Sequence, residues 1–224
     1  MTQTYDHTST HSIISIIHQN DQWLVIDKPA GLSVHNAEDP MNVLSVLERQ
    51  RGHKLFPVHR LDKPTSGILL LACHSEVVAP LQIALRRATK MYVALVRGVP
   101  DPTEGIWAQS ISDRSEGRKN PRGAHRVHAE THYCVTDSNR HLARIECVIK
   151  TGRQHQIRKH CVINRHEIIG DSRYGDRRYQ QKLSQRFGTL PLCLQARSLH
   201  IMIDQQTFMF EAPPRDDWER LTSF

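Results

Sequence analysis

The sequence has few cysteines and no long apolar run, and these absences exclude several classes of protein. Its five cysteines are widely spaced and include no CxxC pair, so we expect reduced thiols rather than a disulfide framework or a cysteine-based zinc site. No apolar segment approaches the roughly 20 residues that span a bilayer, and the polar first ten residues contain no signal-peptide core. We therefore predict a cytoplasmic protein with no membrane partner.

Acidic residues are scarce in the later part of the chain. The 224 residues carry 30 Lys and Arg against 23 Asp and Glu, a formal net charge of +7. Residues 1–50 contain two basic and six acidic side chains, whereas 114–178 contain 15 basic and seven acidic ones. Arginine dominates that second segment and suits bidentate contacts with phosphate. The distribution favours a nucleic-acid partner, although a basic protein with a solvated face would have the same composition.

The chain length and the order of the predicted elements favour one α+β domain. We expect a disordered tail over 1–11 and a single domain over 12–224. Strands and helices mix without the strict alternation of a doubly wound sheet. Hydrophobic periodicity and turn residues predict strands over 12–18, 23–26, 68–72, 91–97, 129–135, 143–150, 192–203 and 207–210, helices over 42–49, 77–89 and 154–163, a basic loop over 112–124, and a helix or lid over 176–190.

The segment from His59 to Gly67, His-Arg-Leu-Asp-Lys-Pro-Thr-Ser-Gly, directly precedes the apolar run 68–72. Side chains alternate in an extended chain, so Arg60 and Asp62 are expected on one face and Leu61 on the other. A loop that ends at a buried strand would hold the Asp62 carboxylate on a rigid base. The alternative interpretation is an ordinary turn in which Asp62 caps local backbone amides.

A second polar segment, from Lys150 to His160, is rich in basic residues. If 154–163 is helical, Gln154 and Arg158 lie one turn apart, and Arg158 can pair with a carboxylate across a cleft and keep it ionised. The alternative is a basic amphipathic surface helix. His155 and His160 point about 140° apart on a helix, so we predict no metal site.

One aromatic residue stands in an alternating strand pattern. Tyr92 shares a face with Ala94 and Val96 in the predicted strand 91–97. Such a tyrosine can belong to the core, or it can stack on a base that has left its helix.

These stretches occur in the order found in one enzyme family, and from about Ser12 to Phe210 the chain resembles the RluA-type pseudouridine synthases. Two departures from the motifs of that family are His166-Glu167, where His-Pro is common, and Leu194-Gln195-Ala196, where Leu-His-Ala is common. The resemblance is carried by five segments: Val25-Ile-Asp-Lys-Pro-Ala-Gly31 through His35, His59-Arg-Leu-Asp62 with Thr65-Ser-Gly67, Lys90-x-Tyr92-x-Ala94-x-Val96-x-Gly98, Thr151-Gly-Arg-x-His155-Gln-Ile-Arg158-x-His160, and Gly170-Asp171 with Tyr174-Gly175.

The resemblance implies an enzyme that isomerises a uridine of structured RNA, ribosomal or transfer RNA, to pseudouridine. It implies a pseudouridine synthase fold, with a mixed, mainly antiparallel sheet, flanking helices and a central basic cleft. Asp62 would be the essential carboxylate, Arg158 its partner, and Tyr92 the active-site tyrosine. The residues expected to bind RNA are Lys28, His59, Arg60, Arg122, Arg126, Arg153 and His155.

The implied reaction breaks the N-glycosidic bond, turns the uracil and rejoins it through C5. The carboxylate would act as a nucleophile or take a ribose proton, and since no water has to be activated, one carboxylate can suffice. We therefore expect no cofactor and no metal. We also expect a monomer without an additional N-terminal RNA-binding domain, because the first motif begins by residue 25.

Two other functions remain open from the residues. One is a non-catalytic RNA-binding protein with a synthase fold, against which the presence of Asp62, Tyr92 and Arg158 argues. The other is a hydrolase that uses Asp62 with His59 or His155. A second well-placed carboxylate or a metal set is missing for that chemistry, and release of free uracil would reveal it.

Overall fold

The computed structural model describes residues 13–36, 38–113, 125–218 and 221. The tail expected over 1–11, most of the basic loop expected over 112–124 and the predicted RNA contact Arg122 lie outside the described residues. The described strands are β1 (Ser15–Gln19), β2 (Trp23–Lys28), β3 (Phe56–Pro57), β4 (Ser66–Ala72), β5 (Thr89–Arg97), β6 (Glu104–Trp107), β7 (Ile111–Ser112), β8 (Arg126–Val127), β9 (Thr131–Ser138), β10 (Leu142–Ile149), β11 (Leu194–Ile203) and β12 (Gln206–Glu211). The described helices are α1 (Val43–Arg51), α2 (Val78–Arg87), α3 (Gln156–Ile163) and α4 (Arg177–Phe187), with short 3-10 turns η1 (Ser75–Val77) and η2 (Asp216–Trp218).

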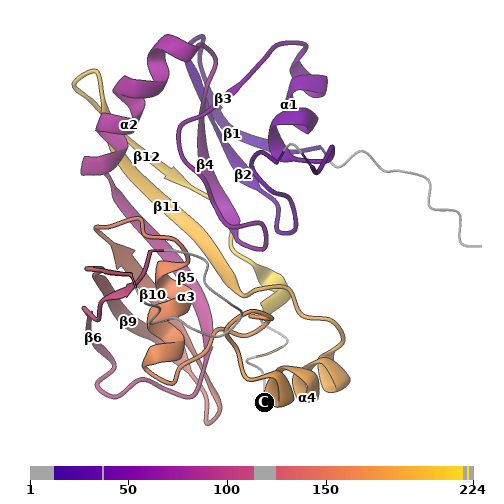
Figure 1. Ribbon diagram of the computed structural model, residues 1–224, viewed down its shortest axis with the longest axis vertical. Helices are drawn as coiled ribbons and strands as arrows, with labels where there is room; N and C mark the ends of the chain where they lie inside the picture. Colours follow the sequence, from indigo (N-terminus) through magenta and orange to yellow (C-terminus); the bar gives the residue numbers. More distant parts are fainter. Residues whose placement is uncertain (1–12, 37, 114–124, 219–220, 222–224) are drawn as a thin grey trace, which may run out of the picture.

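One large sheet organises the fold (Figure 1). Its strands follow the order β1-β2-β4-β11-β5-β10-β9-β6, with β12 paired to β11 and β3 paired to β4. Among the described pairs of this sheet, β4 and β11 are parallel and the others antiparallel. The predicted mixed, mainly antiparallel sheet is therefore confirmed.

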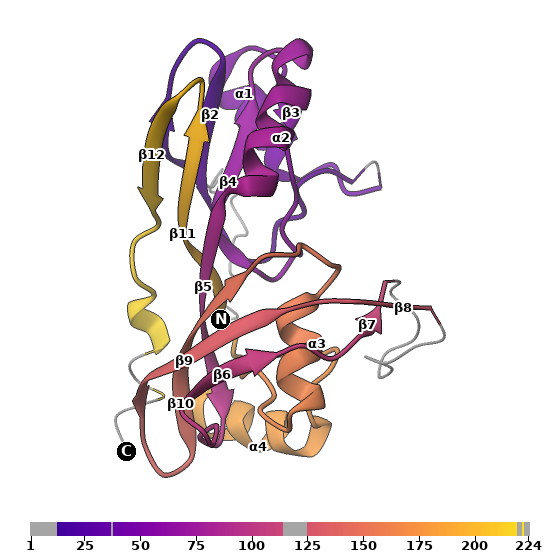
Figure 2. The same cartoon turned by 90° about the vertical axis from the view of Figure 1, so that its left-hand side faces the viewer.

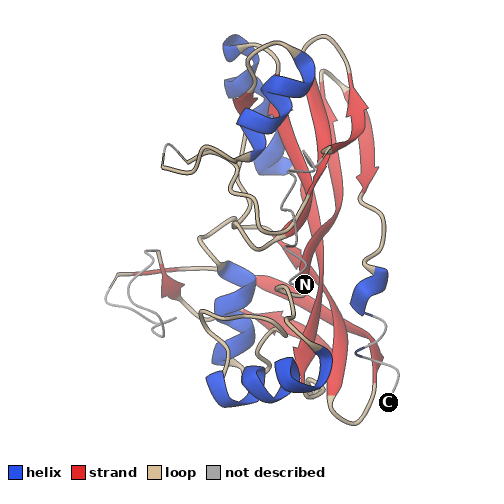
Figure 3. Cartoon of the chain, turned by 90° about the vertical axis from the view of Figure 1, so that its right-hand side faces the viewer, coloured by secondary structure: helices blue, strands red, loops and turns tan. Residues whose placement is uncertain are grey.

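The helices α1 to α4 lie on one face of the sheet, and the short η2 turn lies on the other (Figures 2 and 3). Strand β5 presents alternate residues to these two faces. Tyr92, Ala94 and Val96 share one of them, as the sequence pattern predicts. None of the helices in the described part of the chain has the length and hydrophobicity that crossing a lipid bilayer requires.

Buried apolar side chains form two clusters, one in each half of the elongated molecule. The first gathers around β2, β4, α1 and α2, and the second around β5, β10 and α3. Strand β11 contributes to both, with Leu194 in the second cluster and Leu199 in the first. Tyr92 packs against both clusters, which places it where the two halves meet.

The predicted central strand is the most deeply buried one. All seven residues of β4 are buried, as expected for a continuous apolar run covered on both faces. Its parallel pairing with β11 brings Gly67 against Ala196. A Cβ on Gly67 would lie 2.1 Å from the Ala196 carbonyl oxygen, and the Gly67 backbone has a φ of +104°. Only glycine fits here, directly after the loop that carries Asp62.

Two predicted helix boundaries shift for local reasons. Helix α2 begins at Val78, so Pro80 lies in its first turn, where a missing N–H costs no internal hydrogen bond. Helix α3 begins at Gln156, and its N-cap His155 has a left-handed backbone with a φ of 53°. Gln154 therefore lies outside the helix, and the prediction that Gln154 and Arg158 share a helical face was wrong.

Candidate active site

The carboxylate of Asp62 lies where the two halves of the molecule meet. Its Oδ2 accepts a hydrogen bond of 3.0 Å from Nη1 of Arg158. Arg158 comes from α3 in the second half, 96 residues further along the chain. The Asp62 side chain keeps 19% of its surface exposed, against 5% for Arg158. The pair is thus a partly open carboxylate against a buried cation, and the charge-assisted hydrogen bond fixes the orientation of that carboxylate.

A second carboxylate holds the other side of the same guanidinium. Asp171 accepts hydrogen bonds from Nε of Arg158 at 2.9 Å and from Nη2 at 2.8 Å. Its Oδ1 also accepts the backbone N–H groups of Arg173 and Tyr174. Burial opposes the charge of Arg158, but the hydrogen bonds and charges of Asp171 and Asp62 raise its pKa above the ordinary value. Arg158 therefore stays charged and fixed in orientation.

A neutral histidine stands on the other side of the Asp62 carboxylate. Nε2 of His155 lies 3.6 Å from Oδ1 of Asp62, and Nδ1 of the same ring is 2.8 Å from the Tyr174 hydroxyl. Burial lowers the pKa of His155 to about 4, although Asp62 opposes the shift. A neutral imidazole has one donor and one acceptor nitrogen, so Nδ1 can accept a hydrogen bond from the Tyr174 hydroxyl while Nε2–H faces the carboxylate.

The turn before α3 is fixed by the side-chain amide of Gln156. Its oxygen accepts the Thr151 hydroxyl at 2.7 Å and the Arg153 backbone N–H at 3.1 Å. Its nitrogen donates to the Glu130 carbonyl oxygen at 2.8 Å. One buried glutamine thus satisfies polar groups of the turn and of β9 together. This arrangement fixes the backbone at the start of α3, from which the side chains of His155 and Arg158 reach the site.

The loop that carries Asp62 is tied down after the aspartate by Lys28. The Lys28 side chain has no exposed surface, and its ammonium donates to the carbonyl oxygens of Pro29 (2.8 Å), Leu32 (2.8 Å) and Lys63 (3.2 Å). The Gly31 N–H also donates to the Lys63 oxygen, at 2.9 Å. The expectation that Lys28 contacts RNA does not agree with this burial. The Lys28 ammonium instead binds carbonyl oxygens inside the protein and joins its own loop to the loop that carries Asp62.

The same loop is tied down before the aspartate by His59. Nε2 of His59 accepts the backbone N–H of Leu70 in β4 at 3.0 Å. Burial lowers the pKa of His59 to about 4, with the nearby Lys90 charge acting in the same direction. The structure therefore gives the His59 ring a structural hydrogen bond to β4, and the expectation that His59 binds RNA stays a prediction. Leu61, between His59 and Asp62, is buried in the first cluster.

A small pocket of about 100 Å³ opens onto the Asp62 carboxylate. Asp62, Tyr92, Arg158, His155, Arg60 and Arg153 are among the residues that line it. The structure thus brings these six residues together, and their catalytic and RNA-binding roles stay predictions. Burial and the charge of Asp62 raise the pKa of Tyr92, so its hydroxyl keeps its proton. Arg60 and Arg153 are exposed at the rim, in keeping with the expected basic cleft.

The predicted RNA contact Arg126 lies away from this pocket. Arg126 is exposed in β8, which pairs with β7 in a separate two-stranded sheet that projects beside α3 (Figure 2). Two residues of the site, Asp171 and Tyr174, were quoted in the motif series without a role. The sequence did contain a signal for a functional role: Asp171 lies between Gly170 and Tyr174, and a carboxylate is unusual in a buried segment.

The two departures from the family motifs have their own contacts. Glu167 accepts a hydrogen bond of 3.2 Å from Arg97 and another from the Asp176 N–H at the start of α4. Gln195 is buried and donates to the Pro213 carbonyl oxygen at 2.8 Å. Neither side chain lines the Asp62 pocket. Among the described residues, no group of three or more His, Cys, Asp or Glu side chains is arranged to hold a metal ion.

Comparisons with known proteins agree with this geometry. The chain is 33% identical over 208 residues to tRNA pseudouridine synthase C of Yersinia pestis, covering 84% of this chain and 81% of that one. It is 33% identical over 235 residues to the protein of the same name from Salmonella typhimurium, covering 95% and 90%. The solved structure of human RNA Pseudouridylate Synthase Domain Containing 4 superposes with a TM-score of 0.76 at 28% identity, over 92% of each chain. The RNA pseudouridylate synthase family model matches residues 22–162, and the chain belongs to that family of isomerases.

Proposed function

We propose that this enzyme converts a uridine of transfer RNA to pseudouridine and that Asp62 is its catalytic carboxylate. The choice of transfer RNA rests on the relatives in Yersinia pestis and Salmonella typhimurium, whose names specify that substrate. The observation that carries the catalytic assignment is the partly open Asp62 carboxylate, 3.0 Å from a buried arginine on the wall of a basic pocket.

The reaction balances within the nucleotide itself. The bond from C1′ to N1 breaks, the uracil turns, a bond from C1′ to C5 forms, C5 loses a proton and N1 gains one. Asp62 can assist by attacking C1′ or by taking a ribose proton. In both routes the carboxylate must be aimed at the sugar, and the contacts with Arg158 and His155 support this orientation.

The uracil has to leave its helix before it can react, at a cost of a few kcal/mol. Tyr92 lines the pocket with Asp62, and its ring can stack on the detached base while its protonated hydroxyl stands near the reacting atoms. Arg60 and Arg153 at the rim can bind the phosphates beside the everted nucleotide. A monomer needs no residue from another chain for these roles.

The test compares Asp62→Asn with the wild-type enzyme on transfer RNA from cells that lack this gene. Pseudouridine is mapped by carbodiimide modification and primer extension, and RNA binding is measured by filter retention. The variant should bind RNA as the wild type does and form no pseudouridine. Asp39→Asn is the matched control, because Asp39 forms a surface ion pair of 3.0 Å with Lys63 beside the same loop and such pairs contribute little.

Four results would overturn parts of the proposal. An active Asp62→Asn variant would remove the catalytic assignment. New pseudouridine in ribosomal RNA alone would remove the choice of transfer RNA. If the wild-type enzyme bound RNA but formed no pseudouridine, the non-catalytic alternative would be favoured, and release of free uracil by the wild-type enzyme would favour the hydrolase.

A further inference from the structure

A larger groove adjoins the Asp62 pocket. It has a volume of about 540 Å³, whereas the pocket at Asp62 has about 100 Å³. Arg60, Tyr92, Ile149, Gly152 and Arg153 line both spaces, so the two are continuous. Ligand sites are typically about 300–1,000 Å³, and the larger groove falls within that range. It therefore has room for a part of the substrate that the small pocket cannot hold.

The groove is lined by positive charge. Its basic side chains are Arg60, Arg86, Lys90, Lys150 and Arg153, and no Asp or Glu lines it. Both Arg60 and Arg86 are exposed, and among the residues that the structure describes their guanidinium groups have no hydrogen bond or ion pair. Exposed guanidinium groups around a space without carboxylates are suited to phosphate oxygens.

Apolar side chains complete the groove between these charges. Val58, Leu85 and Ile149 line it together with the face of Tyr92. The combination of an apolar surface and arginines at the edge is complementary to a nucleotide, which has a flat base and a charged phosphate. A purely anionic small molecule would not need the apolar part.

The last turn of α2 is held beside this groove by Lys90. Its ammonium donates to the carbonyl oxygens of Leu85 (2.9 Å) and Ala88 (3.3 Å) at the end of the helix. Free carbonyl groups at a helix C-terminus would repel a phosphate. Lys90 covers two such carbonyls, and Arg86 in the same last turn of α2 lines the groove.

We propose that this groove binds the RNA strand next to the target uridine, and that Arg86 contacts a backbone phosphate there. The proposal rests on the proposed function and adds to it a contact from α2, a helix to which the sequence motifs give no role. With Arg60, Lys150 and Arg153, Arg86 would fix the register of the strand while the everted uridine reaches Asp62. Such contacts set affinity and position rather than the rate of the chemical step.

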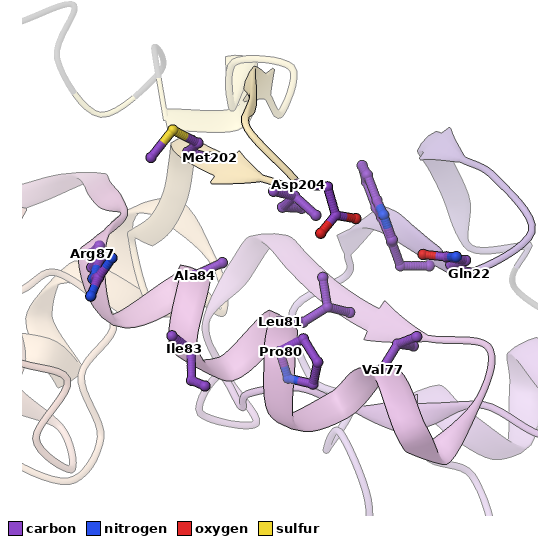
Figure 4. Close-up of a pocket in the computed structure, with 11 residues that line it drawn as sticks. Gln22, Val77, Pro80, Leu81, Ile83, Ala84, Arg87, Met202 and Asp204 are labelled. Carbon is purple, nitrogen blue, oxygen red and sulfur yellow. The ribbon is translucent and has the colours of Figure 1, made fainter.

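The chain offers a matched control in the next residue. Arg87 is also exposed in the last turn of α2, but it lines a different pocket with Ile83 and Met202 (Figure 4). Replacement of Arg86 or Arg87 removes the same charge from the same helix turn. A general electrostatic effect would appear in both variants, whereas a phosphate contact in the groove would appear in Arg86 alone.

The experiment uses one unmodified transfer RNA transcript that the wild-type enzyme converts. Binding is measured at several salt concentrations in the Asp62→Asn background, so that the RNA stays unmodified, and steady-state and single-turnover rates are measured with Asp62 present. We expect Arg86→Ala to raise Kd and KM about three- to tenfold and to reduce the slope of log Kd against log salt by about one. The single-turnover rate at saturating RNA and all values for Arg87→Ala should stay unchanged.

Equal effects of Arg86→Ala and Arg87→Ala, or none in either, would overturn the groove assignment even if the wild-type enzyme forms pseudouridine. A lower rate at saturating RNA with unchanged Kd would also overturn it. If the wild-type enzyme converts no transfer RNA, the proposed function fails, and the salt slopes measured on a transfer RNA that the enzyme binds still decide whether the groove binds RNA. Arg86→Lys provides a further check, because it keeps the charge and should restore most of the slope.

Discussion

Asp171 binds Arg158 through both of its carboxylate oxygens, at 2.8 and 2.9 Å, while Nη1 of the same arginine reaches Asp62. The guanidinium of Arg158 thus binds two carboxylates that differ in their exposure to solvent. Asp171 has 1% of its surface exposed and is closed to substrate, whereas Asp62 has a 19% exposed side chain. Asp171 acts through Arg158, so we regard it as a positioning residue for the Asp62 carboxylate.

Replacement of Asp171 by Asn should lower kcat about 10- to 100-fold, because a misplaced group of this kind commonly has effects of that size. The amide can accept one of the two arginine hydrogen bonds but presents a donor to the other. RNA affinity should not change, which separates this role from an RNA contact. The control is Asp137→Asn, an exposed carboxylate on β9. A raised Kd with normal kcat would contradict the assignment.

Replacement of Lys28 by Met should lower both stability and kcat. The carbonyl oxygens of Pro29, Leu32 and Lys63 lose their buried donor, and each unsatisfied group costs about 1–3 kcal/mol. The Asp62 loop then loses one of its two anchors. Urea unfolding and single-turnover kinetics measure the two effects. Lys63→Met, which removes a 59% exposed ammonium next to Asp62, should change neither; equal behaviour of both variants would refute a structural role for Lys28.

Replacement of Gly67 by Ala should destabilise the fold more than the same change at Gly52. Both glycines have positive φ, +104° and +76°, but only at Gly67 would the added Cβ meet backbone, at 2.1 Å from the Ala196 oxygen. The left-handed backbone alone costs about 1–2 kcal/mol, and the clash forces β4 and β11 apart. The difference in unfolding free energy between the variants reports the close approach. Equal losses of unfolding free energy in the two variants would show that β11 can move to accommodate the added Cβ.

Stability should fall as the pH is lowered from about 6.5 toward 4, where unperturbed histidines take up protons. In the folded protein, burial lowers the pKa of both His59 and His155 to about 4, so in that pH interval the unfolded chain binds protons that the folded chain does not. Stability from these groups is complete above about 6.5 and is lost down to about 4, by at most about 3 kcal/mol for each histidine.

Urea unfolding at a series of pH values measures this slope. His59→Gln should flatten it, because glutamine can still accept the Leu70 N–H and does not titrate. His200→Gln, at an exposed position of β11, is the control. An unchanged slope in His59→Gln would mean that the ring is not held neutral by burial.

The sequence was enough to predict which residues meet at the pocket. It was not enough to predict which residues hold them in position. Asp62, Tyr92 and Arg158 stand in motifs that carry the resemblance to the RluA-type synthases, and side-chain alternation could be read for Asp62 and Tyr92, whereas the helical spacing expected for Arg158 was wrong. The role of Lys28 could not be read, because lysine is rarely buried and its burial depends on two loops meeting. The contact of Gly67 with Ala196 joins parallel strands distant in sequence, and no local pattern specifies that pairing.

Short elements were the other limit. Strands β6, β7 and β8 have four or two residues, too few for alternation to be recognised. The start of α3 was misplaced because His155 adopts a left-handed backbone, a conformation rare for residues other than glycine. That conformation turns its ring toward Asp62 and Tyr174, so the prediction failed at a position that forms part of the site.

The division of the interior into two apolar clusters has a consequence for when the enzyme becomes competent. Asp62 belongs to the half built around the first cluster and Arg158 to the half built around the second. Neither half by itself contains Asp62 together with Arg158, so under the proposed function a nascent or nicked chain with only one half folded would lack the assembled site. The enzyme would therefore become active only after both halves have folded. Recovery of activity on refolding should follow the half that folds more slowly.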